Sequence, residues 1–277
     1  MQFTSPQAEH RYAELIAAAS HAVVGLDFDG VLSPIVPDPD QARIHPAGPA
    51  TLIGLAQVVR QVAVVTGRPA RQAVTLGDLD EVGDAIAATG RELLVLGQYG
   101  NERWSSADRR VTSPQPPPGL ASLMRELPAL LAEHGLAGAH LEEKGLAVAV
   151  HTRRMPDPGG AASLLEPVLA DSAARHGLVT EPGRYVVEVR APGMDKGQAV
   201  RRLQREYQAE AFMFIGDDLG DVPAFQAVIN LRSQGMPGLL VCSASDEQPA
   251  LTDLADVIVD GPDGVMALLR RLTGEAG

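Results

Sequence analysis

A short apolar run that ends in two carboxylates constrains this chain more than any other segment. Residues 22–26, Ala-Val-Val-Gly-Leu, are followed by Asp27, Phe28, Asp29 and Gly30. The run is too short for a helix of its own and is typical of a buried parallel strand. Ligands of open parallel sheets bind beyond the carboxyl ends of the strands, which is where Asp27 and Asp29 fall. Two neighbouring carboxylates repel each other, so the pair indicates a bound cation.

The composition limits the compartment and the partners of the chain. With 277 residues, 45% of them hydrophobic, it can bury a sizeable core in one large domain or two modest ones. The net charge of −12 argues against nucleic acid and anionic membranes as partners. Cys242 is the only cysteine, which excludes a disulfide framework and a thiolate zinc cluster. Without an apolar run of membrane-spanning length or a signal-peptide pattern, we expect a cytoplasmic monomer.

Strands and helices alternate over residues 1–105 and again over 192–277, which indicates an α/β core with a mostly parallel sheet. Between these parts, the Pro-rich segment 113–119 interrupts regular structure, and an α+β pattern follows it. We therefore predict a core formed by 1–105 with 192–277 and an inserted α/β domain over 106–191. Domains inserted in this way often act as lids over the site of their host.

The pattern predicts the following elements. Strands are expected at 22–26, 62–65, 93–96, 212–215, 238–242 and 257–259 in the core, and at 138–142, 146–152, 178–181 and 185–190 in the insert. Helices are expected at 7–20, 49–61, 195–207, 220–229 and 262–272 in the core, and at 120–134 and 159–176 in the insert, with one short helix between 242 and 257.

Four short polar segments share one position, the carboxyl end of a core strand or the start of the next helix. They are residues 27–30, 66–68, 195–197 and 216–221. Together they would bring carboxylates, a hydroxyl, an arginine and a lysine to one crevice, an inventory suited to phosphoryl transfer. Taken singly, each segment also fits an ordinary turn or helix cap. Their common placement favours the functional interpretation.

Phosphoryl transfer gives each of these side chains a role. Asp27 would attack phosphorus as a carboxylate nucleophile and form an aspartyl-phosphate. Asp29 would protonate the leaving alcohol and then deprotonate the water that hydrolyses the intermediate. Thr66 and the Gly67 N–H would hold phosphate oxygens, and Lys196 would balance charge in the transition state.

The acidic residues also predict a Mg²⁺ site. This hard cation takes oxygen ligands, usually one or two carboxylates together with phosphate and water. Asp27 and Asp217 would supply carboxylates, and Asp29 would reach the ion through its backbone carbonyl. Asp218 and Asp221 would support these ligands from the outer shell.

The four segments, in this order, resemble those of the haloacid dehalogenase superfamily, and the resemblance extends to its trehalose-6-phosphate phosphatases. Residues 27–35, Asp-Phe-Asp-Gly-Val-Leu-Ser-Pro-Ile, look like the first motif of that family. Residues 142–153 look like its lid segment, and 188–190 followed by 195–197 look like its return to the core. The similarity implies a Rossmann-like core with an inserted α/β lid, and Mg²⁺-dependent hydrolysis of trehalose 6-phosphate to trehalose and phosphate.

The resemblance also implies where substrate binds. Sugar contacts would come from Glu142, Lys144, Arg153 and Glu188. Gly67 and Arg68 are further candidate substrate-binding residues. From the residues alone, the charges of the lid segment equally fit a solvated sheet edge. Residues 97–102, Gly-Gln-Tyr-Gly-Asn-Glu, are a further candidate for the sugar pocket, although their glycines also suit a simple turn.

The chain departs from the family pattern at two positions and leaves other functions open. Gly220 and Val222 stand where the family usually has threonine and glutamate, which affects the outer shell of the metal. One alternative is the same chemistry on another sugar or aminocyclitol phosphate. A second is a sugar-phosphate-binding protein that has lost catalysis. A signalling phospho-acceptor is disfavoured, because the acidic pairs lie far apart in the sequence and a large insert separates them.

Overall fold

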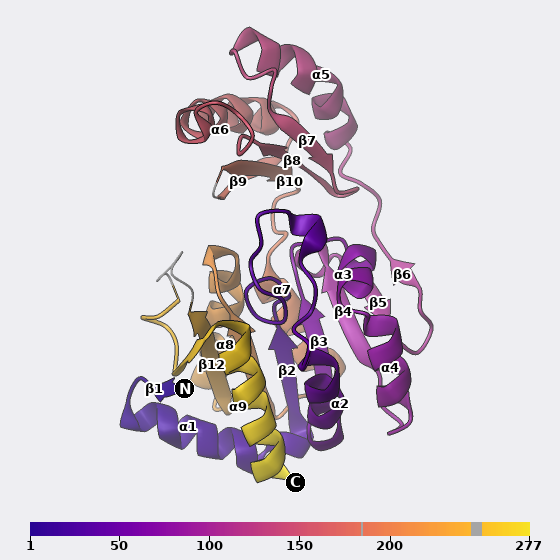
Figure 1. The fold of residues 1–277 in the computed structure, drawn as a ribbon, viewed down its shortest axis with the longest axis vertical. Helices are drawn as coiled ribbons and strands as arrows, with labels where there is room; N and C mark the ends of the chain where they lie inside the picture. Colours follow the sequence, from indigo (N-terminus) through magenta and orange to yellow (C-terminus); the bar gives the residue numbers. More distant parts are fainter. Residues whose placement is uncertain (184, 245–250) are drawn as a thin grey trace. The chain divides into compact units, whose positions relative to one another are not determined.

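The computed structural model describes residues 1–183, 185–244 and 251–277, which form two compact units (Figure 1). The core unit is Met1–Ser113 with Asp195–Gly277, and the inserted unit is Pro114–Met194. None of the helices in these described ranges combines the length and apolar character needed to cross a membrane.

The core unit is built on one mixed sheet. Its parallel strands are β2 (Ala22–Leu26), β3 (Gln61–Val65), β4 (Leu93–Gly97), β11 (Ala211–Gly216), β12 (Gly238–Ala244) and β13 (Val257–Asp260). The antiparallel strands are β1 (Gln2–Phe3), β5 (Glu102–Ser105) and β6 (Val111–Thr112). Over the described residues the order is β1-β13-β12-β11-β2-β3-β4-β5-β6, which places β2 in the middle of the sheet.

Helices cover both faces of this sheet, which explains the unbroken apolar run of β2. One face carries α1 (Pro6–Ala17), α2 (Gly48–Val58), α3 (Ala70–Leu76), α4 (Leu79–Ala87) and α9 (Gly261–Ala276), and the other carries α7 (Lys196–Glu206) and α8 (Val222–Ser233). Alternate side chains of a strand point to opposite faces. Val24 and Leu26 accordingly join the first apolar cluster, and Val23 joins the second. Both faces of β2 are therefore dry, and its end is where polar groups begin.

The inserted unit has a sheet and an apolar core of its own. Its antiparallel strands are β7 (His140–Glu143), β8 (Ala147–His151), β9 (Val179–Gly183) and β10 (Val186–Arg190), in the order β7-β8-β10-β9. Helices α5 (Leu120–Glu133) and α6 (Pro158–Arg175) pack on one face. Val148 and Val150 of β8 and Val187 and Val189 of β10 point toward them.

The α/β class, the parallel core sheet and the paired strands of the insert are confirmed. The unit boundaries lie at 113/114 and 194/195, where the sequence placed them at 105/106 and 191/192, because β5 and β6 continue the core sheet to Thr112. The short helix expected between 242 and 257 falls partly on 245–250, outside the described residues, and 251–254 form turns.

Candidate active site

The carboxyl end of β2 holds Asp27 in a fixed position. Its backbone N–H donates to the Ile215 carbonyl of β11 at 3.0 Å, so the ladder continues one residue beyond the strand. The Phe28 N–H donates to Asp27 Oδ1 at 2.6 Å, and the Asp27 side chain is buried. Gly30 then turns the chain at φ +69°, in the left-handed region that favours glycine. A Cβ on Gly30 would lie 2.1 Å from Asp217 Oδ2, so this glycine also lets Asp217 approach the turn.

Lys196 joins the two halves of the core unit at this point. It opens α7, whose first turn is capped by the Asp195 carboxylate accepting from the Gln198 N–H at 2.9 Å. Lys196 Nζ lies 2.7 Å from Asp27 Oδ2 and 2.7 Å from Asp221 Oδ1, and all three side chains are buried. Burial alone would lower the pKa of Lys196, but the carboxylates of Asp221 and Asp27 raise this pKa well above its ordinary value.

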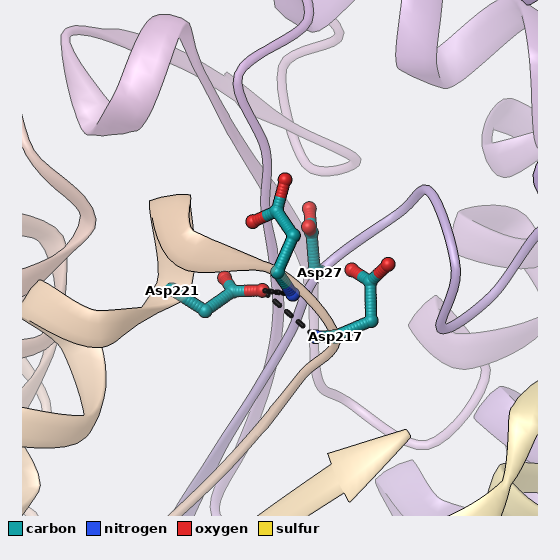
Figure 2. Close-up of side chains that lie close together, drawn as sticks. Asp27, Asp217 and Asp221 are labelled. Carbon is teal, nitrogen blue, oxygen red and sulfur yellow. Dashed lines mark hydrogen bonds between the residues drawn. The ribbon is translucent and has the colours of Figure 1, made fainter. Parts of the chain in front are cut away.

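Asp221 in turn organises the acidic turn after β11. The backbone N–H of Asp217 donates to Asp221 Oδ2 at 2.9 Å, one of the bonds drawn in Figure 2. The Gly220 N–H donates to Asp218 Oδ1 at 2.8 Å, and Asp218 and Asp221 form a capping box around the one-turn helix η4 (Leu219–Asp221). Backbone N–H groups and the carboxylates of Asp218 and Asp221 therefore hold this turn, without the side chains of residues 220 and 222. Gly220 and Val222 therefore leave the Asp221–Lys196 contact intact.

Four carboxylates converge at this site. Within the described residues, Asp27, Asp217, Asp218 and Asp221 each offer an oxygen within 4.8 Å of the others. Figure 2 shows the side chains of Asp27, Asp217 and Asp221 close together. Burial, with the charges of Asp27 and Asp221 next, raises the pKa of Asp217 to about 10. Burial also raises the pKa of Asp27 well above its ordinary value, against the opposing effect of Lys196.

The donor set fits a hard divalent cation. Three buried acidic side chains face one buried ammonium, and the raised pKa values of Asp27 and Asp217 indicate that full ionisation of the site needs a cation besides Lys196. Oxygen ligands of this kind are those that Mg²⁺ prefers. Asp27 and Asp217 are the buried members of the predicted ligand set, and the Asp29 carboxylate is not part of the acidic group.

The Asp29 carboxylate is bonded to Arg68 instead. Arg68 Nε donates to Asp29 Oδ2 at 2.6 Å and a terminal nitrogen donates to Oδ1 at 2.7 Å, a bidentate pair at a half-exposed position. Sequence reasoning assigned both residues to the site, and the structure brings them together. The sequence pattern does not indicate that Asp29 and Arg68 bind each other.

Thr66, Gly67 and Arg68 form the turn after β3, and the turn after β4 holds it. Thr66 is buried and its Oγ1 accepts the Arg68 N–H at 3.2 Å. In η3 (Gln98–Gly100), the N–H of Gln98 donates to the Arg68 carbonyl and that of Tyr99 to the Thr66 carbonyl, both at 2.9 Å. The two turns are therefore tied together at two points.

Ser243, which the sequence pattern did not indicate, supports the turn after Asp27 and Asp29. Ser243, buried at the end of β12, donates its hydroxyl to the Gly30 carbonyl at 2.6 Å. The contact depends on the parallel placement of β12 two strands away from β2, and no pattern within the sequence of either segment indicates it.

The polar face of the inserted sheet gathers most of the charges predicted to contact sugar. Cross-strand pairing places Glu142, Ala149, Glu188 and Glu181 in one row across β7, β8, β10 and β9. Lys144 Nζ lies 2.7 Å from Glu188 Oε2, and His151 Nε2 lies 2.8 Å from Glu142 Oε2.

Two arginines differ from expectation in this unit. Arg153 is exposed in the turn after β8. Arg190, which sequence reasoning did not assign, lies 3.6 Å from Glu188 Oε1 and bonds Glu181 at 2.8 Å. The Glu-Val-Arg alternation of 188–190 was the available signal, because residues two apart share one face of a strand.

Both the sequence and the structure of this chain are similar to those of trehalose-phosphate phosphatases. The family model described as trehalose-phosphatase matches residues 25–256. Trehalose-phosphate phosphatase B of Arabidopsis thaliana is 29% identical over 285 residues, which cover 96% of this chain and 71% of that protein. An uncharacterized glycosyl hydrolase of Mycobacterium tuberculosis is 34% identical over 240 residues. The match covers 81% of this chain but only 17% of that protein.

Solved structures agree on the fold. The C-terminal domain of Candida albicans trehalose-6-phosphate phosphatase matches 97% of this chain and 96% of its own, with a TM-score of 0.74 and 20% identity.

Proposed function

The chain belongs to the trehalose-phosphatase family, and we propose that it hydrolyses trehalose 6-phosphate to trehalose and phosphate in a Mg²⁺-dependent reaction. Members of this family are phosphoric monoester hydrolases. The observation that carries the proposal is the buried contact of Asp27 with Lys196 at the end of β2, beside the acidic turn of Asp217 and Asp221.

We infer that Asp27 is the nucleophile. Its carboxylate oxygen attacks phosphorus, the bond from phosphorus to the ester oxygen breaks, and an aspartyl-phosphate forms. Water then attacks this phosphorus and releases phosphate and free Asp27. Lys196 stays charged beside Asp27 and balances negative charge throughout. Asp27, Asp217 and the Asp29 carbonyl would hold Mg²⁺, which would offset the repulsion between the nucleophile and the phosphate dianion.

Asp29 is the proposed acid and base. It donates a proton to the leaving sugar oxygen and later takes one from the attacking water. Because Asp29 is bonded to Arg68 at both oxygens, proton transfer requires that it exchange this partner for the ester oxygen. Arg68, once released, is placed to bind the phosphate together with Thr66 and the Gly67 N–H.

Specificity for the disaccharide is proposed to come from the inserted unit. Glu142, Lys144, Arg153 and Glu188 would bind sugar hydroxyls. Buried polar groups reject an analogue that lacks a hydroxyl, because they are then left unpaired. The Lys144–Glu188 pair is of this kind, since both side chains are largely buried.

A phosphate-release panel tests the proposal. Trehalose 6-phosphate, other disaccharide and monosaccharide phosphates and an aminocyclitol phosphate are compared with and without EDTA, using Asp27→Asn as the inactive control. We expect trehalose 6-phosphate to rank among the best substrates and EDTA to abolish turnover. Another ester far ahead would reassign the substrate, and absence of metal-dependent turnover would favour a binding protein.

We also propose that the enzyme acts as a cytoplasmic monomer on a small-molecule sugar phosphate. Its net charge and its lone cysteine support a reducing compartment and a substrate bound through a few placed cations. Light scattering during size-exclusion chromatography measures the oligomeric state, and a dimer mass would contradict this part.

A further inference from the structure

The turn at Gln98 and Tyr99 has a backbone that ordinary side chains rarely adopt. Gln98 has φ 48° and Tyr99 has φ 59°, two successive non-glycine residues in the left-handed region. Bulky residues there are outliers that persist only where the surroundings hold them. The two hydrogen bonds to Thr66 and Arg68 hold this turn. A Cβ on Gly100 would also lie 2.8 Å from Ala199 Cβ of α7, so the turn packs closely against that helix.

This backbone directs the Tyr99 side chain onto the phosphate-binding turn. A Cβ built on Gly67 would lie 3.0 Å from Tyr99 Cζ and 3.1 Å from its Oη, so the hydroxyl end of the ring lies directly against Gly67. Both residues are only partly buried, so each keeps surface that a ligand can reach. Any group attached to a phosphate on Thr66 and Gly67 therefore starts next to the Tyr99 ring.

We propose that Tyr99 is a substrate-binding residue that contacts the sugar carbons and hydroxyl nearest the phosphate. The inference rests on the proposed function, because it takes the Thr66–Gly67 turn as the phosphate site. A tyrosine suits a sugar, since its ring packs on C–H groups and its hydroxyl exchanges hydrogen bonds with alcohols. Tyr99 belongs to the core unit, as do Thr66 and Gly67.

The test separates recognition of the sugar from recognition of phosphate. For wild type, Tyr99→Leu and Tyr99→Phe, the KM for trehalose 6-phosphate is compared with the inhibition constant of inorganic phosphate. We expect Tyr99→Leu to raise KM about tenfold, a loss of about 1.4 kcal/mol, and to change the inhibition constant less than about twofold. Tyr99→Phe, which keeps the ring, should give an intermediate KM.

A matched control and two outcomes make the result decisive. Tyr207→Phe removes another hydroxyl of the core unit, one that donates to Glu92 at 2.7 Å, and should leave both constants unchanged. An unchanged KM in Tyr99→Leu, or an equal rise in both constants, overturns the inference. If wild type does not hydrolyse trehalose 6-phosphate, the proposed function fails separately, and the same comparison is made with the best ester of the panel.

Discussion

At the scale of single residues, the site is defined by one buried cation among three buried carboxylates. Lys196 Nζ lies 2.7 Å from both Asp27 and Asp221. Asp217 lies beside these carboxylates, and within the described residues it forms no ion pair with a basic side chain. Breaking a buried ion pair by removing one partner leaves an uncompensated buried charge. The stability of the protein and its activity are therefore linked through the same few atoms.

Replacing Lys196 should lower both the stability and the activity of the protein. We expect Lys196→Met to lower the free energy of unfolding by about 3–5 kcal/mol, because Asp27 and Asp221 then lie buried without their cation. Turnover should be lost as well. Denaturant unfolding of the metal-free protein measures the change. The double variant Lys196→Met with Asp27→Asn should recover part of the stability but no activity, and equal stabilities of the single and double variants would contradict the coupling.

The stability of the metal-free protein should also depend on pH through Asp217. Its pKa rises from the ordinary 3.8 to about 10 on folding, through burial and then the charges of Asp27 and Asp221. Between these values the folded state holds a proton that the unfolded chain has released, so stability falls as pH rises through this window. We expect the Tm of metal-free protein to fall by at least about 5 °C between pH 6 and pH 9.

Two comparisons isolate this contribution. Asp217→Asn should show a markedly flatter dependence of Tm on pH, because the group that takes up the proton is gone. Saturating Mg²⁺ should raise the Tm of wild type more at pH 9 than at pH 6, since cation and proton compete for the same carboxylates. A pH dependence identical in wild type and Asp217→Asn would contradict the assignment.

At the scale of elements, the contact between α7 and α8 sets the position of Lys196. Gly197, the second residue of α7, faces the backbone of α8, and a Cβ there would lie 2.5 Å from the Pro223 carbonyl oxygen. Backbone atoms cannot swing aside as a side chain can. A larger residue would move the start of α7 as a whole, and Lys196 with it.

Gly197→Ala should therefore damage both stability and turnover. We expect a loss of about 1–3 kcal/mol from overpacking and at least about a tenfold fall in kcat from misplacement of Lys196. Gly54→Ala is the matched control. Gly54 lies within α2, and its Cβ would meet only Thr273 Cγ2 of α9 at 3.7 Å, an ordinary contact, so the change should stabilise by up to about 1 kcal/mol. Wild-type kcat in Gly197→Ala would contradict the argument.

Some elements of the fold can be predicted from local sequence patterns and others cannot. The six parallel strands were predictable, because each is a short, mostly apolar run bounded by turn residues, and all but β13 are almost fully buried. Helices α3 and α4 were not, since neither gives a long amphipathic pattern. Asp27 and Asp217 were predicted from their position at the ends of strands, and Lys196 from its position at the start of a helix. The Asp29–Arg68 pair and the Ser243–Gly30 contact depend on how distant strands are placed, which no local pattern records.

At the scale of the whole molecule, the inserted unit has what a domain needs to fold alone. Leu123, Leu127, Leu165 and Leu169 of its helices pack on the valines of its sheet in a cluster confined to this unit. We expect the fragment 114–194 to unfold cooperatively on heating, as measured by circular dichroism. The same fragment carrying Leu165→Ala is the control. Its free energy of unfolding should be lower by about 2–5 kcal/mol, and its melting temperature should fall accordingly. Absence of a cooperative transition would show that the unit depends on the core.

The central place of β2 has a consequence for the order in which the enzyme is made. One neighbour of β2 is β3, encoded about 40 residues downstream, and the other is β11, whose Phe212 pairs with Val23. During translation, β2 keeps one unpaired edge until the segment at 211–216 leaves the ribosome, after the entire inserted unit. Asp27, Lys196 and the acidic turn meet only then. We therefore expect the nascent chain to be inactive until residues 211–221 have emerged, and its exposed strand edge is the surface that a chaperone would protect until then.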